Sequence, residues 1–215
     1  PFDEIREIVS DCFGSLLTGH QSMQPIIYRE FPKHTNVIQY TKSDQAIINM
    51  GGNACSSNDR VANSAFHILS HIIGGDLSSR MYSILREKHG LAYQTGFDFS
   101  SIHELGYWNA FAYCNPTEYK TCVKLMHRIL DDIVVDGVLE KELNSAKNYL
   151  VGTNRFDQES VSFKASSIAN LIALGYDIDF YTSREDRIRS ITLPQIKQLV
   201  DQWLGRDNRY THILV

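Results

Sequence analysis

Two histidines spaced four residues apart are the first candidates for chemistry in this sequence. They frame the run His67-Ile68-Leu69-Ser70-His71, and side chains at i and i+4 of a helix can both reach one zinc ion. Hydrolysis at such a centre also needs a carboxylate that takes a proton from the zinc-bound water, and Ser70 is not one. We therefore interpret His67 and His71 as ordinary helix residues at the polar edge of a packed face, with a degenerate metal site as the alternative. The remaining histidines are dispersed: His20, His34, His89, His103, His127 and His212.

The segment that follows the second histidine carries the most information. It reads Ile72-Ile73-Gly74-Gly75-Asp76-Leu77-Ser78-Ser79-Arg80-Met81-Tyr82, and then Leu85-Arg86-Glu87-Lys88-His89-Gly90-Leu91-Ala92-Tyr93. This pattern resembles the second, zinc-free half-domain of the M16 (pitrilysin and mitochondrial processing peptidase-like) zinc metallopeptidases. Weaker matches support it at residues 45–51, 106–108, 139–143 and 192–196, so the resemblance runs from about residue 26 to the end.

The resemblance implies that the zinc belongs to another half. Catalytic halves of this family carry His-x-x-Glu-His and a distant glutamate ligand, whereas the matching neighbourhood here, residues 147–150, has no carboxylate and Glu142 lies about two turns too early. We expect no metal and no cofactor in this chain, and zinc in a partner half on the same parent chain or on a separate subunit. The two halves would enclose an unfolded peptide substrate. A homodimer is left open.

Motif position gives the candidate site residues. Arg86 and Tyr93 are the catalytic candidates: Arg86 would donate hydrogen bonds to a substrate carbonyl, and the Tyr93 hydroxyl would stabilise the oxyanion. Arg80, Gly74 and Gly75 are the candidates for substrate binding. The alternatives are an Arg86 paired with a neighbouring acid, a Tyr93 packed on the core, and an Arg80 that only fixes the glycine turn.

Hydrophobic periodicity predicts the elements that position these residues. Helices are expected over residues 2–17, 59–73, 79–88, 115–136 and 139–174, the last broken near 152–158, and from 192 onward. Strands are expected at 26–28, 37–40, 46–48, 91–100, 107–114 and 212–215. Alternation places Tyr93, Thr95, Phe97 and Phe99 on one face of their strand. The glycines at 74 and 75 would permit a sharp helix exit.

Strands in antiparallel groups and helices in blocks predict an α+β fold, a two-layer α/β sandwich with a largely antiparallel sheet and helices packed on one face. We assign residues 1–24 to a linker helix and loop from a preceding half, and residues 25–215 to the M16 C-terminal (inactive) peptidase domain. The net charge of −4, with no basic cluster, excludes a nucleic acid partner. No apolar run is long enough to span a membrane.

Three functions compete. The first is the non-catalytic partner half of an M16-type zinc metalloendopeptidase. The second is a non-proteolytic structural subunit, like the bc1 core proteins of the same fold, and the third is a freestanding peptide-binding domain. The four cysteines, which lack a CxxC pair, favour a reducing cytoplasmic compartment; a periplasmic or organellar location is left open.

Overall fold

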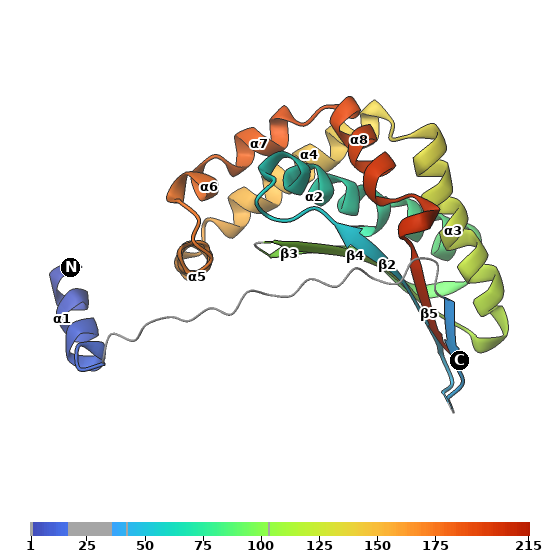
Figure 1. Ribbon diagram of the computed structural model, residues 1–215, viewed down its shortest axis with the longest axis horizontal. Coiled ribbons are helices and arrows are strands. Elements are labelled where there is room, and N and C mark those ends of the chain that lie inside the picture. Colours follow the sequence, from blue (N-terminus) through green and yellow to red (C-terminus); the bar gives the residue numbers. More distant parts are fainter. Residues whose placement is uncertain (1, 17–35, 42, 103) are drawn as a thin grey trace.

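Five strands form one sheet in the computed structural model, which describes residues 2–16, 36–41, 43–102 and 104–215 (Figure 1). The strand order is β1-β5-β2-β4-β3; β1 runs parallel to β5, and the other neighbours are antiparallel. The strands are β1 (Asn36–Gln39), β2 (Ala46–Ala54), β3 (Ala92–Ile102), β4 (Leu105–Cys114) and β5 (Tyr210–Leu214). The predicted strand at 26–28 lies outside the described residues.

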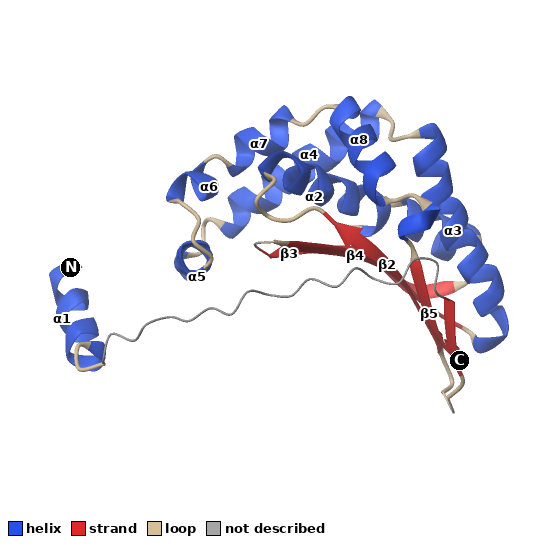
Figure 2. Ribbon diagram, in the orientation of Figure 1, coloured by secondary structure: helices blue, strands red, loops and turns tan. Residues whose placement is uncertain are grey.

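Helices cover one face of this sheet (Figure 2), which confirms the predicted two-layer α+β sandwich; α1, none of whose residues is buried, takes no part in this layer. The described helices are α1 (Phe2–Phe13), α2 (Arg60–Gly74), α3 (Tyr119–Asp136), α4 (Glu140–Asp157), α5 (Val161–Ala173), α6 (Ile178–Thr182), α7 (Arg184–Ser190) and α8 (Leu193–Trp203). A π-helix, η1 (Tyr82–Lys88), and two short 3-10 turns, η2 (Pro116–Glu118) and η3 (Arg206–Asn208), complete the described elements. None of the described helices is long and apolar enough to cross a membrane.

Side-chain alternation separates a buried face of the sheet from an open one. Burial alternates along the whole of β2, and in β4 Trp108, Ala110 and Ala112 point into the core beneath the helices. The opposite face carries Tyr107 and Tyr113, and no described helix packs on it. The period of two in the sequence therefore gives one layer of helices, not two.

Helix α2 is the centre of the core, because its Phe66 and Leu69 are fully buried against the sheet. Phe66 stacks on Phe99 of β3 with ring centroids 4.5 Å apart, and Phe97 of β3 stacks on Trp108 of β4 at 5.3 Å. Asp59 caps the helix by accepting a hydrogen bond from the amide of Ala62 at 2.9 Å. These contacts fix α2 against the edge strand β3.

The two glycines at the end of α2 allow close packing. The reason expected from the sequence, a sharp exit from the helix, is wrong. Gly75 has φ −80° and ψ −26°, a conformation open to any residue, and neither glycine has a positive φ. A Cβ on Gly74 would lie 2.3 Å from the Phe97 amide nitrogen, and one on Gly75 would lie 2.5 Å from His71 Nδ1. Glycine is needed at 74 because the helix backbone nearly touches β3 there.

One stretch differs from the sequence-based expectation, because residues 178–190 form α6 and α7, which were not predicted. The break expected near 152–158 in the stretch 139–174 lies at residues 158–160, between α4 and α5. Helices α6 and α7 are short, and of their residues only Ile188 is buried, so they lack a long apolar stripe. The helix predicted at 2–17 is present as α1, and all its residues are exposed.

We predict that Gly74→Ala destabilises the chain while Gly152→Ala does not. The methyl group at 74 would force α2 away from β3 at a cost of about 1–3 kcal/mol. Gly152 lies in the exposed middle of α4 with no atom within 4 Å of an added Cβ, so alanine there should stabilise by about 0.5–1 kcal/mol. Urea unfolding of both variants measures this. Equal stability of Gly74→Ala and the unmodified chain would contradict the packing role.

Candidate functional site

Arg86 and Tyr93 meet where the π-helix η1 turns into β3. Gly90, with φ 61°, ends the turn, and the amide of Leu91 donates to the carbonyl of Leu85 at 2.8 Å. This reversal brings the guanidinium of Arg86 back over the strand, where Nη1 donates to the Tyr93 carbonyl at 2.8 Å. A β-bulge between Ala92 and Gln94 removes Tyr93 from the ladder with β4, which leaves that carbonyl available.

The same bulge changes the face on which Tyr93 lies, so the expectation that it shares a face with Phe97 is wrong. Phe97 points into the core, whereas Tyr93 is 49% exposed and its ring lies 6.1 Å from that of Tyr113 on the open face. The Tyr93 hydroxyl donates to Gln45 Oε1 at 2.6 Å. The alternative of a core-packed Tyr93 is thereby excluded.

Arg86 has a largely uncommitted guanidinium. It is exposed, lies with its Cζ 5.1 Å from the centroid of the Tyr82 ring, and makes no ion pair with an acidic residue in the described part of the chain. The alternative of an acid-paired Arg86 is therefore not what the described structure contains. An exposed cation and an exposed phenol hydroxyl at one end of an edge strand could together donate to a carbonyl oxygen or an oxyanion.

Arg80, six residues earlier, is bound within the fold. Its Nε and Nη2 donate to the two carboxylate oxygens of Glu142, each at 2.8 Å, and Nη2 also donates to the carbonyl of Gly137 at 2.9 Å. These bonds join the start of η1 to the connection between α3 and α4. Burial alone would raise the pKa of Glu142, but hydrogen bonds from Arg80 and from the Leu139 amide outweigh it and hold this pKa below the usual value.

His67 occupies surroundings that oppose a metal cation. Its ring meets the Phe99 ring edge-on with centroids 5.1 Å apart. Burial, together with the smaller effect of the positive charge of Arg184, lowers the pKa of His67 to about 4. Ser70, between the two histidines, donates its hydroxyl to the His67 carbonyl at 3.1 Å.

His71 is held by different neighbours. It stacks on Tyr149 of α4 with centroids 4.2 Å apart, and its Nε2 lies 3.4 Å from Asp76 Oδ2. Burial lowers the pKa of His71, and Asp76 opposes that shift. Among the residues that the structure describes, no three His, Cys, Asp or Glu side chains come together to hold a metal ion. The two histidines do not fit a catalytic zinc site.

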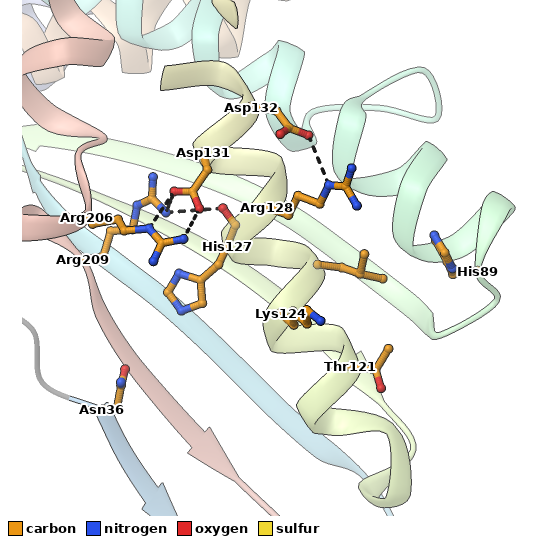
Figure 3. A pocket seen from close by; sticks show the side chains of 11 residues that line it. Asn36, His89, Thr121, Lys124, His127, Arg128, Asp131, Asp132, Arg206 and Arg209 are labelled. Atoms are coloured by element: carbon orange, nitrogen blue, oxygen red, sulfur yellow. Dashed lines mark hydrogen bonds and ion pairs between the residues drawn. The ribbon is translucent and has the colours of Figure 1, made fainter. Parts of the chain in front are cut away.

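A charged network beside α3 was not anticipated from the sequence. It borders a hollow of about 780 Å³ (Figure 3), where Asp131 accepts hydrogen bonds from Arg206 and Arg209. The Arg209 side chain is only 2% exposed and also donates to the Leu204 carbonyl at 2.7 and 2.9 Å. Burial would raise the pKa of Asp131, and the two arginines bring it below its usual value. The network anchors the start of β5 to α3, and no sequence signal links residues 78 positions apart.

We predict that Arg80→Ala destabilises the chain by about 1.5–3 kcal/mol, because a partly buried carboxylate loses its charged partner. Arg128→Ala is the matched control, since Arg128 is 76% exposed and lies 3.9 Å from its partner Asp132; it should cost less than about 1 kcal/mol. Denaturant unfolding at neutral pH measures both.

The same pair predicts a pH dependence. The folded-state pKa of Glu142 is lowered, so its contribution is present above its usual value and is lost as the pH falls through the folded-state pKa. The stability difference between Arg80→Ala and the unmodified chain should therefore shrink in acid. A difference that stays constant as the pH is lowered would rule out this pairing as its source.

Comparisons of the sequence with known proteins agree on one family. The sequence model of a family described as "Peptidase M16 inactive domain" matches residues 1–150. A Helicobacter pylori protein described as a non-peptidase homologue is 20% identical over 200 residues, covering 92% of this chain and 46% of the relative. A Streptomyces coelicolor protein described as an uncharacterised zinc protease is 26% identical over 167 residues, covering 77% and 36%. The chain thus spans less than half the length of these two relatives.

A solved structure agrees at the level of fold. The crystal structure of a peptidase M16 inactive domain from Pseudomonas fluorescens superposes with a TM-score of 0.89 at 18% identity, covering 100% of this chain and 51% of that one. The matched segment includes both the glycine turn after α2 and the run from Arg86 to Tyr93. This chain therefore belongs to the family of the peptidase M16 inactive domain.

Proposed function

We propose that this chain is the zinc-free half of an M16-type zinc metalloendopeptidase, which closes a substrate chamber against a zinc-bearing half. The observation that carries the proposal is the hydrogen bond from Arg86 Nη1 to the Tyr93 carbonyl. It couples a guanidinium that has no acidic partner among the described residues to an exposed tyrosine at the end of an edge strand. Neither side chain packs in the core. Both are therefore available to contact a substrate or a partner half.

Each residue would have a distinct role. Arg86 would donate its remaining N–H groups to the main chain of the substrate. The Tyr93 hydroxyl would leave Gln45 and donate to the oxyanion that forms at the scissile carbonyl; one such donor is worth about 2.7–4 kcal/mol of transition-state stabilisation. Gln45 would then serve as a resting partner that holds the phenol ready.

Zinc and the base that activates water would come from the partner half, and the peptide would lie between the two. Arg80, Gly74 and Gly75 would act indirectly: the Arg80–Glu142 pair and the close contact of Gly74 with β3 hold η1 in place. A cytoplasmic location is part of the proposal.

A non-proteolytic subunit of the same fold is the second candidate. The observation that favours it is the Helicobacter pylori relative, which is described as a non-peptidase homologue and covers most of this chain. The discriminating fact is whether a partner half that carries His-x-x-Glu-His associates with this chain.

The first prediction concerns Tyr93→Phe, assayed with the zinc-bearing half. We expect kcat to fall by about 100-fold or more, because the oxyanion loses a donor, with a small change in stability from the lost bond to Gln45. Gln45→Ala is the matched control, since it breaks the same bond but keeps the hydroxyl, and it should retain most of kcat. If Gln45→Ala is as slow as Tyr93→Phe, the tyrosine acts only through the fold.

The second prediction concerns metal content. The purified chain should contain far less than one zinc per molecule and cleave no peptide, because the positive charge of Arg184 acts on His67 and, in the part of the chain that the structure describes, no group of three ligating side chains forms around the two histidines. Elemental analysis after dialysis against zinc measures this. One zinc per chain, lost in His67→Ala, would contradict the proposal.

A further inference from the structure

A second feature lies at the end of the helical layer that is away from the C-terminus, where α5, α6 and α7 gather (Figure 1). A cavity of about 330 Å³ is walled there by α2, α4 and these three helices. A neighbouring hollow of about 280 Å³ shares Asn63, His67 and Phe180 with it and reaches the edge strand β3 at Phe99. The two hollows adjoin, so the cavity opens toward the edge of the sheet.

The cavity wall contains donors that have no acceptor. The side chain of Arg184, the first residue of α7, makes no hydrogen bond and no ion pair with the residues that the structure describes. On the neighbouring wall residues, the Nε of Arg187 and the hydroxyl of Tyr181 are buried without a partner. Buried donors without acceptors are rare in folded proteins, and each one costs free energy. Two such groups on one cavity wall, beside the unbonded guanidinium of Arg184, indicate that an acceptor joins them. The other nitrogens of Arg187 are engaged, since Nη1 donates to Ser183 Oγ at 2.6 Å and Nη2 donates to the Phe180 carbonyl at 2.7 Å.

No carboxylate in the cavity wall balances its positive charge, although the charge of Asp157 acts on Arg184 from outside the wall. No aspartate or glutamate lines either hollow, while Arg184 and Arg187 line the first. Burial lowers the pKa of Arg187, and the charges of Arg60 and Arg184 lower it further, with no carboxylate opposing them. Arg60 is paired with Asp177 at 3.7 Å, and neither residue lines the cavity.

The remaining wall combines apolar and polar side chains. Leu150, Leu171 and Leu174 line it from α4 and the end of α5, together with the polar Asn63, Ser64, Ser167 and Asn170. We propose that this cavity binds a small organic oxyanion, a carboxylate or phosphate group attached to a short apolar group. Arg184, Arg187 and Tyr181 would donate to the oxyanion, and the leucines would contact the apolar part. This site is separate from Arg86 and Tyr93, and the inference does not depend on the proposed peptidase role.

The oxyanion could be a carboxylate or a phosphate, and matched probes distinguish these two. N-acetyl-leucine carries a carboxylate on an apolar side chain, as the end of a peptide does. N-acetyl-leucinamide has the same shape without the charge, and inorganic phosphate has the charge without the apolar part. Binding of each to the 215-residue chain is measured by calorimetry and by the shift in Tm.

We expect N-acetyl-leucine, phosphate or both to bind and raise Tm, and N-acetyl-leucinamide to do neither. Arg184→Met should weaken binding about tenfold or more. Its Tm without ligand should change little, because the substitution breaks no hydrogen bond among the described residues and removes a largely desolvated charge that only Asp157 opposes. Tyr181→Phe, which removes only a hydroxyl, provides a second variant if Arg184→Met does not fold.

Arg128→Met is the control, because Arg128 borders the separate hollow beside α3. It should bind the probes as the unmodified chain does. The proposal is overturned if no anion binds, if the amide binds as well as the carboxylate, or if binding survives in both Arg184→Met and Tyr181→Phe. Loss of binding in Arg128→Met alone would place the anion in the other hollow and also overturn it.

Discussion

The close approach of α2 to the edge strand β3 is the constraint on which the rest of the site depends. An added Cβ at Gly74 would lie 2.3 Å from the Phe97 amide nitrogen, so the helix end and the strand are nearly in backbone contact. The stacked pairs Phe66–Phe99 and Phe97–Trp108 hold the two elements at that spacing. Because η1 leaves from the end of α2 and returns into β3, its position is set by this contact. The orientation of Arg86 follows from it.

Two arginines in this segment differ in whether their positive charge is paired within the fold. Arg80 donates to Glu142 and to the Gly137 carbonyl, and thereby fixes the start of η1 to the helical layer. Arg86, one and a half turns later on the same segment, finds no acid and donates only to the Tyr93 carbonyl among the described residues. A bound cation stabilises the fold, and an exposed cation that is free of acids is available to a partner or substrate. The same contrast separates Arg209, which is fully engaged, from Arg184, which is not.

The sequence predicted the sandwich and most of its elements, because alternation in β2 and β4 and the apolar stripe of α2 are strong local signals. The motif also identified Arg86 and Tyr93 as candidates for the same site. The sequence misplaced Tyr93, because a bulge shifts the alternation by one residue and leaves no mark in the pattern. It could not find the Arg209–Asp131 anchor or the cavity at Arg184, since both join side chains far apart in the chain. The packing reason for Gly74 was likewise visible only once β3 was in place.

The central claim is that this chain completes an active site without holding the metal. The most direct measurement is peptidase activity as this chain is added to a zinc-bearing half that carries His-x-x-Glu-His. The account predicts negligible activity for either component alone, and activity that rises with added chain and saturates at equal amounts of the two. Full activity of the zinc-bearing half alone, unchanged by this chain, would contradict the account.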